Sequence, residues 1–174
     1  MEAMQLDVFE AIKNHIYEIP VDYTKSIQEL LKIADFDWEE CGEYRKNDVL
    51  SFPHPYEHTG KKTMKMKIFR FYQESVYETE VIKKMDDDGY RPANIIELIS
   101  LSLKHPYIYI HEEDIIWAIG SKGKIISNKH YHDSYPILTG NDKERMCMAY
   151  TFISHARIGY VLKPDKWTFL GVQK

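Results

Sequence analysis

The sequence predicts an α+β domain, in which a mostly antiparallel sheet carries two or three helices packed on one face. Three capping signals, each followed by apolar residues at helical spacing, lie in the first two thirds of the chain. Strand-length runs of alternating or continuous apolar residues separate these segments and dominate the last third. Because no internal repeat or low-complexity linker divides the 174 residues, we expect a single domain covering residues 1–174.

The N-terminal segment has the apolar spacing of a short amphipathic helix. Its apolar residues recur about once per helical turn, at Val8, Phe9, Ile12 and Ile16. Residues 1–16 are therefore expected to form a helical arm, which packs on its own domain or becomes ordered on contact with a neighbour. The overlapping sequence I-Y-E-I-P-V-D-Y alternates in the manner of a strand.

Three further helices are predicted from capping boxes, in which a cap side chain and a carboxylate three residues later satisfy free backbone N–H groups. The boxes are, in chain order, Ser26 with Glu29, Ser75 with Glu78, and Asn94 with Glu97. The stripes that follow are Ile27, Leu30, Leu31 and Ala34; then Val76, Val81, Ile82 and Met85; then Ile95, Leu98 and Ile99. The second helix is expected to end in a left-handed cap at Gly89, and the third to be deeply packed because it is apolar around its girth.

Strands are predicted from alternation or from continuous apolar runs. They are expected at Thr63–Tyr72, Ile115–Ile119, Ile125–Ser127, Met146–Ile153 and Trp167–Val172, with a short strand near Val49–Phe52. Gly120–Lys124 is expected to form a hairpin turn between two of these strands. The polar stretches Glu39–Lys62 and Asn128–Tyr135 are otherwise expected to form loops.

Composition excludes several classes of protein. The net charge of −4 argues against general binding to nucleic acids or anionic membranes. With only two cysteines, Cys41 and Cys147, neither a disulfide framework nor a cysteine zinc site is expected, and a reducing compartment fits. No apolar run reaches about 18 residues, and the N-terminus lacks the apolar core of a signal peptide. We therefore expect a cytoplasmic protein with no membrane association.

Two histidine-bearing segments are the candidate binding sites. The first contains His54, Glu57 and His58, and the second contains His130, His132 and Asp133. Imidazole and carboxylate groups bind divalent metals, and histidines two residues apart on a strand share one face. Neither segment has the spacing of a recognised zinc site, so both fit polar surface loops as well, and no metal or cofactor is expected.

Three other features have a chemical and a structural interpretation. Gly120–Lys124 resembles a phosphate-binding loop, but it lacks the required spacing and precedes a strand, which favours a turn. The lysines around Thr63–Tyr72, interleaved with aromatic residues, suit either an RNA-binding face or a protected sheet edge. Arg91 and His111–Asp114 are the polar ends of the strongly apolar segment Tyr90–Ser121, and they complete the list of candidate functional residues.

Several blocks of sequence resemble an uncharacterised family of small bacterial and phage-type proteins. The blocks are V-D-Y-T-K-S-I-Q-E-L-L with F-D-W, G-Y-R-P-A-N-I-I-E-L-I-S-L, I-I-W-A-I-G-S, and the C-terminal F-L-G-V-Q-K. The resemblance implies a shared fold, but no activity, cofactor or catalytic residue comes with it. Residues Asn128–Pro164 look unlike the family, so they are a candidate for a function private to this chain.

Two functions from different classes remain open. The first is a non-enzymatic binding or inhibitor protein, phage- or mobile-element-encoded, that contacts a host protein through a surface rich in the 13 tyrosines. The second is a small-ligand or nucleotide binder, or a metal-assisted hydrolase, that uses the loop histidines. The first is preferred because the sequence contains no paired acid and base, metal or phosphate signature, and the sequence leaves self-association open.

Overall fold

The computed structural model describes residues 15–34, 52–55, 58–72, 76–106, 108, 115–127, 130–140, 146–153, 157–158 and 167–174. The strands are β1 (Ile16–Asp22), β2 (Lys61–Phe71), β3 (Val76–Tyr77), β4 (Tyr90–Pro92), β5 (Ile116–Trp117), β6 (Gly123–Ser127), β7 (His130–Gly140), β8 (Met146–Ile153), β9 (Arg157–Ile158) and β10 (Trp167–Gln173). The helices in these residues are α2 (Ile27–Ala34), α5 (Glu78–Asp87) and α6 (Ile95–Lys104). None of them is long and apolar enough to cross a membrane.

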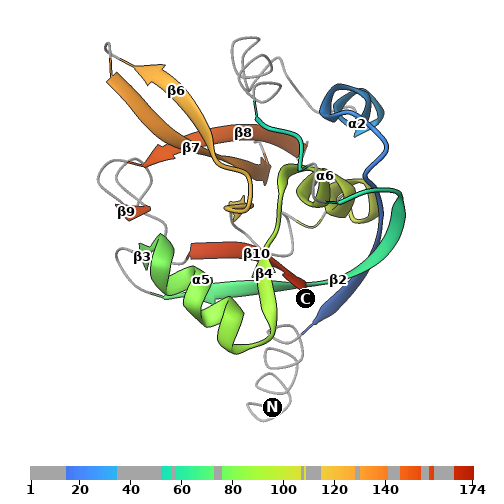
Figure 1. Cartoon of the computed structure of the whole chain (residues 1–174), viewed down its shortest axis with the longest axis horizontal. Helices are drawn as coiled ribbons and strands as arrows, with labels where there is room; N and C mark the ends of the chain where they lie inside the picture. Colours follow the sequence, from blue (N-terminus) through green and yellow to red (C-terminus); the bar gives the residue numbers. More distant parts are fainter. Residues whose placement is uncertain are drawn as a thin grey trace, which may run out of the picture.

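The C-terminal strand β10 lies inside an eight-stranded sheet (Figure 1). On one side it pairs with β2, which in turn pairs with β1, and both pairings are antiparallel. On the other side β10 pairs with β4 and, in parallel, with β5. β7 continues the sheet beyond β5 and also pairs with β6 and β8. The α+β class and the mostly antiparallel sheet are thus confirmed.

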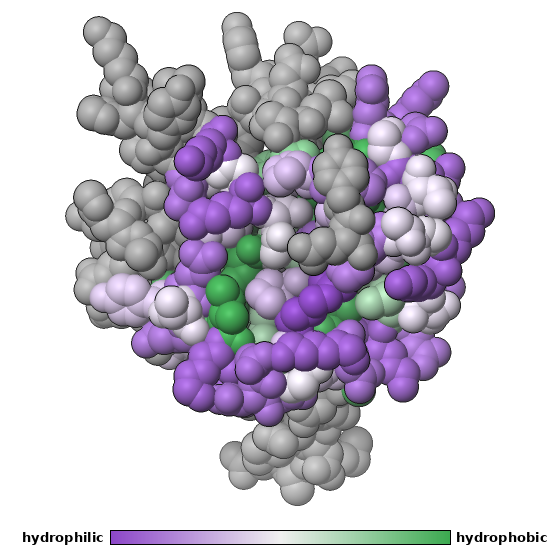
Figure 2. Space-filling model, viewed as in Figure 1, coloured by the Kyte–Doolittle hydropathy of each residue, from purple (hydrophilic) through white to green (hydrophobic). Residues whose placement is uncertain are grey.

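The helices divide between the two faces of the sheet. One hydrophobic cluster joins α2 and α6 to β2 residues Met66 and Ile68, whereas a second joins α5 to Phe69 on the opposite face of β2. In Figure 1, α2 and α6 lie together at the upper right and α5 lies at the lower left. The expectation of helices on one face therefore holds for α2 and α6 but not for α5. On the side drawn in Figure 2, hydrophilic side chains predominate, and hydrophobic atoms appear mainly as a narrow strip between them.

Two of the three predicted capping boxes are confirmed, and the third begins at a different residue. Ser26 and Glu29 exchange bonds at the start of α2, and Asn94 and Glu97 do so at the start of α6. α5 begins only at Glu78, behind Tyr77, whose N–H donates to Glu80 at 3.1 Å. The prediction from Ser75 was therefore wrong, and two residues placed in that helix behave differently: Val76 lies in β3, and Ile82 is exposed.

The end of α5 follows the prediction. Gly89 has a φ of 82°, a left-handed conformation that glycine adopts without the steric penalty of a Cβ atom. Its N–H donates to the carbonyl oxygen of Asp86 at 3.0 Å. The chain then enters β4 directly, which brings Arg91 next to α6.

Two expectations about the later strands were wrong. Asn128–Tyr135 was expected to be a loop, but residues from His130 onward belong to β7, where backbone pairing with β6 and β8 on opposite sides tolerates a polar sequence. Gly120–Lys124 was expected to turn a hairpin between β5 and β6. These two strands instead lie one after the other along the same edge of β7. The predictions for residues 1–14, the strand at residues 49–51 and residues 111–114 lie outside the described residues.

Candidate functional site

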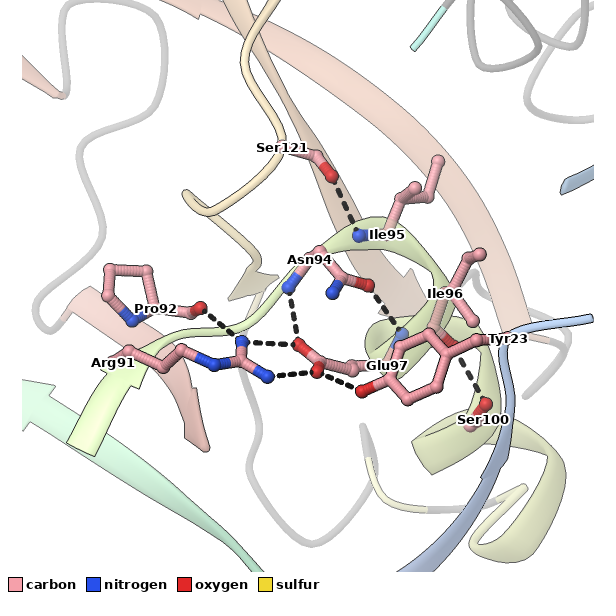
Figure 3. A network of polar contacts seen from close by, with 9 residues as sticks. All are labelled: Tyr23, Arg91, Pro92, Asn94, Ile95, Ile96, Glu97, Ser100 and Ser121. Carbon is pink, nitrogen blue, oxygen red and sulfur yellow. Dashed lines mark hydrogen bonds and ion pairs between the residues drawn. The ribbon is translucent and has the colours of Figure 1, made fainter. Parts of the chain in front are cut away.

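The best-formed polar cluster lies at the N-terminus of α6 (Figure 3). Asn94 has the extended backbone of a cap residue, and its side-chain oxygen accepts from the N–H of Glu97 at 3.1 Å. In return, the Glu97 carboxylate accepts from the N–H of Asn94 at 2.8 Å. The box turns a glutamate side chain back beneath the first turn of a helix whose residues Ile95–Ser102 are all buried.

The Glu97 carboxylate is fully buried and accepts four hydrogen bonds. Arg91 donates to both of its oxygens, at 3.0 and 2.5 Å, in the bidentate geometry that suits a planar guanidinium. The Tyr23 hydroxyl supplies another donor, and the cap N–H of Asn94 supplies the fourth. Burying a carboxylate is costly unless it is paired and hydrogen-bonded, and here both oxygens have two donors each.

The surroundings shift the pKa of both partners of Glu97. Burial, and then the charge of Glu97, raise the pKa of Tyr23 well above its usual value, so the phenol stays a hydrogen-bond donor. Burial by itself lowers the pKa of Arg91, but the bonds to Glu97 outweigh it and raise that pKa overall. Tyr23 is therefore held as a neutral phenol and Arg91 as a guanidinium cation, and both donate to the Glu97 carboxylate.

The connection after β5 holds this cluster from the side. Ser121 accepts the first helical N–H, that of Ile95, at 2.9 Å. Gly120 donates its N–H to the carbonyl oxygen of Ala93 at 2.9 Å. A Cβ atom on Gly120 would lie 2.7 Å from that oxygen, so only glycine allows the approach. The candidate phosphate loop thus has a structural use, which is to bring Ser121 to the start of α6.

The first histidine segment packs beside this cluster. The His58 ring lies against Tyr23, with ring centroids 5.1 Å apart, and the His54 Nε2 lies 3.3 Å from the carbonyl oxygen of Lys25. Glu57 lies outside the described residues. His58 therefore reaches this cluster through Tyr23. Arg91 binds the buried Glu97 carboxylate directly, so it is not an open anion-binding group.

The second histidine segment is part of β7. His130 lies opposite Ser127 and His132 opposite Ile125 in the ladder with β6. Asp133 binds Lys122, with a distance of 2.8 Å between the charged atoms. The described residues contain no group of three or more His, Cys, Asp or Glu side chains that could hold a metal ion.

A second polar cluster, which the sequence did not predict, lies between α5 and β7. Lys122 lies 2.8 Å from Asp133 and 3.7 Å from Glu78, and its ammonium sits 5.8 Å from the centre of the Tyr135 ring. The bond to Asp133 is the main reason why the pKa of Lys122 is raised. Burial, followed by Glu78, raises the pKa of Tyr135. Glu78 lies far from the other three residues in sequence, and only Asp133 had been noted as a candidate.

Two lysines in the basic stretch of β2 are paired with acidic side chains. Lys61 pairs with Asp22 at 3.6 Å, and Lys67 pairs with Asp88 at 3.3 Å. Phe69, which a stacking surface would need to expose, is buried in the core. β2 pairs with β1 over Lys61–Lys67 and with β10 over Met66–Phe71, so Lys61, Lys62 and Lys65 have a described neighbouring strand on one side.

β1 forms one end of the described sheet. Within the part of the chain that the structure describes, β1 pairs with β2 and with no second strand. Ile16 is 48% exposed near its start, and Tyr17 contacts the rings of His15 and His105 with centroid distances of 4.4 and 5.2 Å. The fold and these clusters define an α+β protein whose best-satisfied polar site is architectural and whose open edge carries apolar and aromatic groups.

Comparisons with known proteins add no relative to this description. No protein-family model, curated protein or solved structure matches the chain.

Proposed function

We propose that the chain is a non-enzymatic binding protein, of an inhibitor type encoded by a phage or mobile element, that acts through protein–protein contacts. The observation that carries the binding role is the exposed edge of β1. An edge strand presents unpaired N–H and C=O groups, and an extended segment of a partner can add to it as a further strand. The inhibitor role and the mobile-element origin derive from the small size, the acidity and the resemblance of the sequence to phage-type proteins.

The register shows which backbone groups of β1 point outward. Tyr23 donates its N–H to Gly60 on the β2 side at 2.9 Å, in the same register as the β1–β2 ladder. Hydrogen-bonding residues alternate along an antiparallel strand, so Ile19 also faces β2, whereas Ile16 and Glu18 face outward. Pro20 faces outward too, where its missing N–H costs no ladder bond. A partner strand therefore has two donors available before Pro20, beside the exposed side chain of Ile16.

The test is to remove one outward donor without disturbing the β1–β2 ladder. Glu18→Pro does this, because proline is tolerated on an edge strand when its nitrogen faces away from the neighbour. Glu18→Thr is the matched control, since it removes the same charge and keeps the N–H. The tagged wild type and both variants would be used to recover partners from a lysate of the source cell, after equal urea midpoints have shown that all three fold.

We expect a partner that is recovered with the wild type and with Glu18→Thr, and that is lost with Glu18→Pro. Equal recovery with Glu18→Pro would show that the partner binds elsewhere. Failure to recover any partner with the wild type would count against the binding role as a whole.

A further inference from the structure

The cluster of Glu78, Lys122, Asp133 and Tyr135, here called the α5–β7 cluster, contains a polar group that its own residues leave unused. The Tyr135 side chain is fully buried, and among the described residues its hydroxyl makes no hydrogen bond of ordinary geometry, although Glu78 and Lys122 both lie close enough to interact with it. A buried hydroxyl without a partner is unfavourable by about 1–3 kcal/mol, so such a group calls for a specific explanation.

The unused hydroxyl lies beside two carboxylates that meet from different elements. Glu78 begins α5, and Asp133 lies in β7; the position of the Lys122 nitrogen, 3.7 and 2.8 Å from their oxygens, marks the point where they converge. Glu78 and Lys122 both interact electrostatically with the Tyr135 hydroxyl, which places that hydroxyl at the same point. Two carboxylate oxygens and a neutral hydroxyl oxygen are hard ligands of the kind that Mg²⁺ and Ca²⁺ prefer.

The cation now at this point can leave without disturbing the core. The Lys122 side chain is 47% exposed, and it belongs to the connection between β5 and β6 and not to a strand. Its ammonium is a compact point charge on a flexible stem. Lys124 lies opposite Asp133 in the ladder and is exposed, but no ion pair joins it to Asp133 among the described contacts.

We infer that the α5–β7 cluster is a binding site for a divalent cation of the Mg²⁺ or Ca²⁺ class, and that Lys122 occupies it when the cation is absent. Glu78 and Asp133 supply the charged ligands, the Tyr135 hydroxyl supplies a neutral one, and waters complete the coordination. With only two carboxylates and a competing ammonium, the affinity belongs to the weak range of about 10⁻⁴–10⁻³ M. This site is independent of the β1 edge and lies on different elements.

The experiment compares cation binding by the wild type and by Lys122→Met, which removes the competitor and keeps the aliphatic stem. Binding of Mn²⁺ would be measured by electron paramagnetic resonance, with Ca²⁺ and Mg²⁺ as competitors. Binding of Tb³⁺ would be followed by emission excited through tyrosine, since Tyr135 would be in direct contact with the ion. Lys62→Met, which removes an exposed lysine of β2, is the control for a general change in net charge.

We expect Lys122→Met to bind Mn²⁺ about tenfold more tightly than the wild type, because a like charge is removed within a few ångströms of the ion. Lys62→Met should match the wild type, and the double variant Lys122→Met with Asp133→Asn should lose binding. The inference would be overturned if Lys122→Met binds no better than Lys62→Met, or if its binding survives Asp133→Asn. Urea midpoints confirm that each variant is folded before its binding is compared.

Discussion

Tyr23 and Tyr135 have similar surroundings, but their hydroxyl groups differ in hydrogen bonding. Tyr23 and Tyr135 are both buried, and each lies beside a carboxylate and a cationic side chain. Tyr23 donates to Glu97, whose remaining lone pairs are filled by Arg91 and Asn94, whereas the Tyr135 hydroxyl makes no hydrogen bond of ordinary geometry with a described residue. The difference teaches that a polar cluster with every bond satisfied is part of the architecture, while an incompletely satisfied one has room for a ligand.

The largest expected difference between the two clusters lies in their cationic side chains, Arg91 and Lys122. Arg91→Met leaves the fully buried Glu97 carboxylate without its bidentate partner and is expected to lower the free energy of unfolding by about 3–5 kcal/mol. Lys122→Met, whose lysine and partner Asp133 are 47% and 41% exposed, is expected to change it by about 0–1 kcal/mol. Urea unfolding of both variants measures the difference. Equal losses would contradict the distinction between the two clusters.

The tyrosines themselves provide a matched pair of conservative changes. Tyr23→Phe removes a hydrogen bond to a buried charge and is expected to cost about 1.5–3 kcal/mol. Tyr135→Phe removes a hydroxyl that makes no hydrogen bond of ordinary geometry with a described residue, and it is expected to be neutral or stabilising by about 1 kcal/mol. The same urea curves distinguish the two outcomes. A loss above about 1 kcal/mol in Tyr135→Phe would mean that its hydroxyl does have a stabilising role.

The connection that joins the two clusters should tolerate no added volume. In Gly120→Ala, the new methyl group would lie 2.7 Å from the carbonyl oxygen of Ala93, a backbone atom that can shift little. We expect a loss of about 1–3 kcal/mol, comparable to overpacking in a core. Lys122→Ala, two residues later on the same connection, is the control and should be nearly neutral. A neutral Gly120→Ala would show that this connection is more adaptable than its close contacts suggest.

The smallest expected effect belongs to His105 at the end of α6, whose ring contacts Tyr17. Burial, and then the charges of Lys104 and His15, lower the pKa of His105 from its ordinary value of 6.5. As pH falls, the unfolded chain therefore takes up this proton first, so the contribution to stability is full above pH 6.5 and declines below it. His105→Gln should show a smaller loss of stability between pH 7.5 and 5.5 than the wild type, measured by urea midpoints. An identical loss in the two proteins would assign the pH dependence to other groups.

Local signals in the sequence predicted what is decided locally. Two capping boxes and the positive φ of Gly89 follow from residues within one turn of each helix end, and all three were predicted. The start of α5 was misplaced: Val76 and Tyr77 form β3, and the helix begins at Glu78, where the Tyr77 N–H donates to the Glu80 carboxylate. The pairing of Val76 with Ile158 of β9, which is distant in sequence, makes this part of the chain a strand and not the first turn of the helix.

The features that failed depend on partners distant in sequence. The polar residues that begin β7 suggested a loop, because nothing local indicates pairing with both β6 and β8. Glu97 was predicted only as a cap residue, since its bond to Tyr23 spans 74 positions. The candidate histidines were chosen by local spacing, and the structure uses His58 to pack against Tyr23. Of the candidate residues, only Asp133 belongs to the cluster for which we infer a ligand.

Ser121 and Lys122 are neighbours in the chain, and each belongs to a different polar cluster. Ser121 accepts the first N–H of α6, and the next residue, Lys122, occupies the point between Glu78 and Asp133. Any ligand that displaces the lysine acts on a segment whose preceding residue holds the start of the most buried helix. Because Lys122 follows Ser121 directly, displacing the lysine is expected to shift Ser121, and a variant at the start of α6 is expected to change cation affinity in turn. The peptide bond between Ser121 and Lys122 would then carry the effect of cation binding at the surface to the buried start of α6.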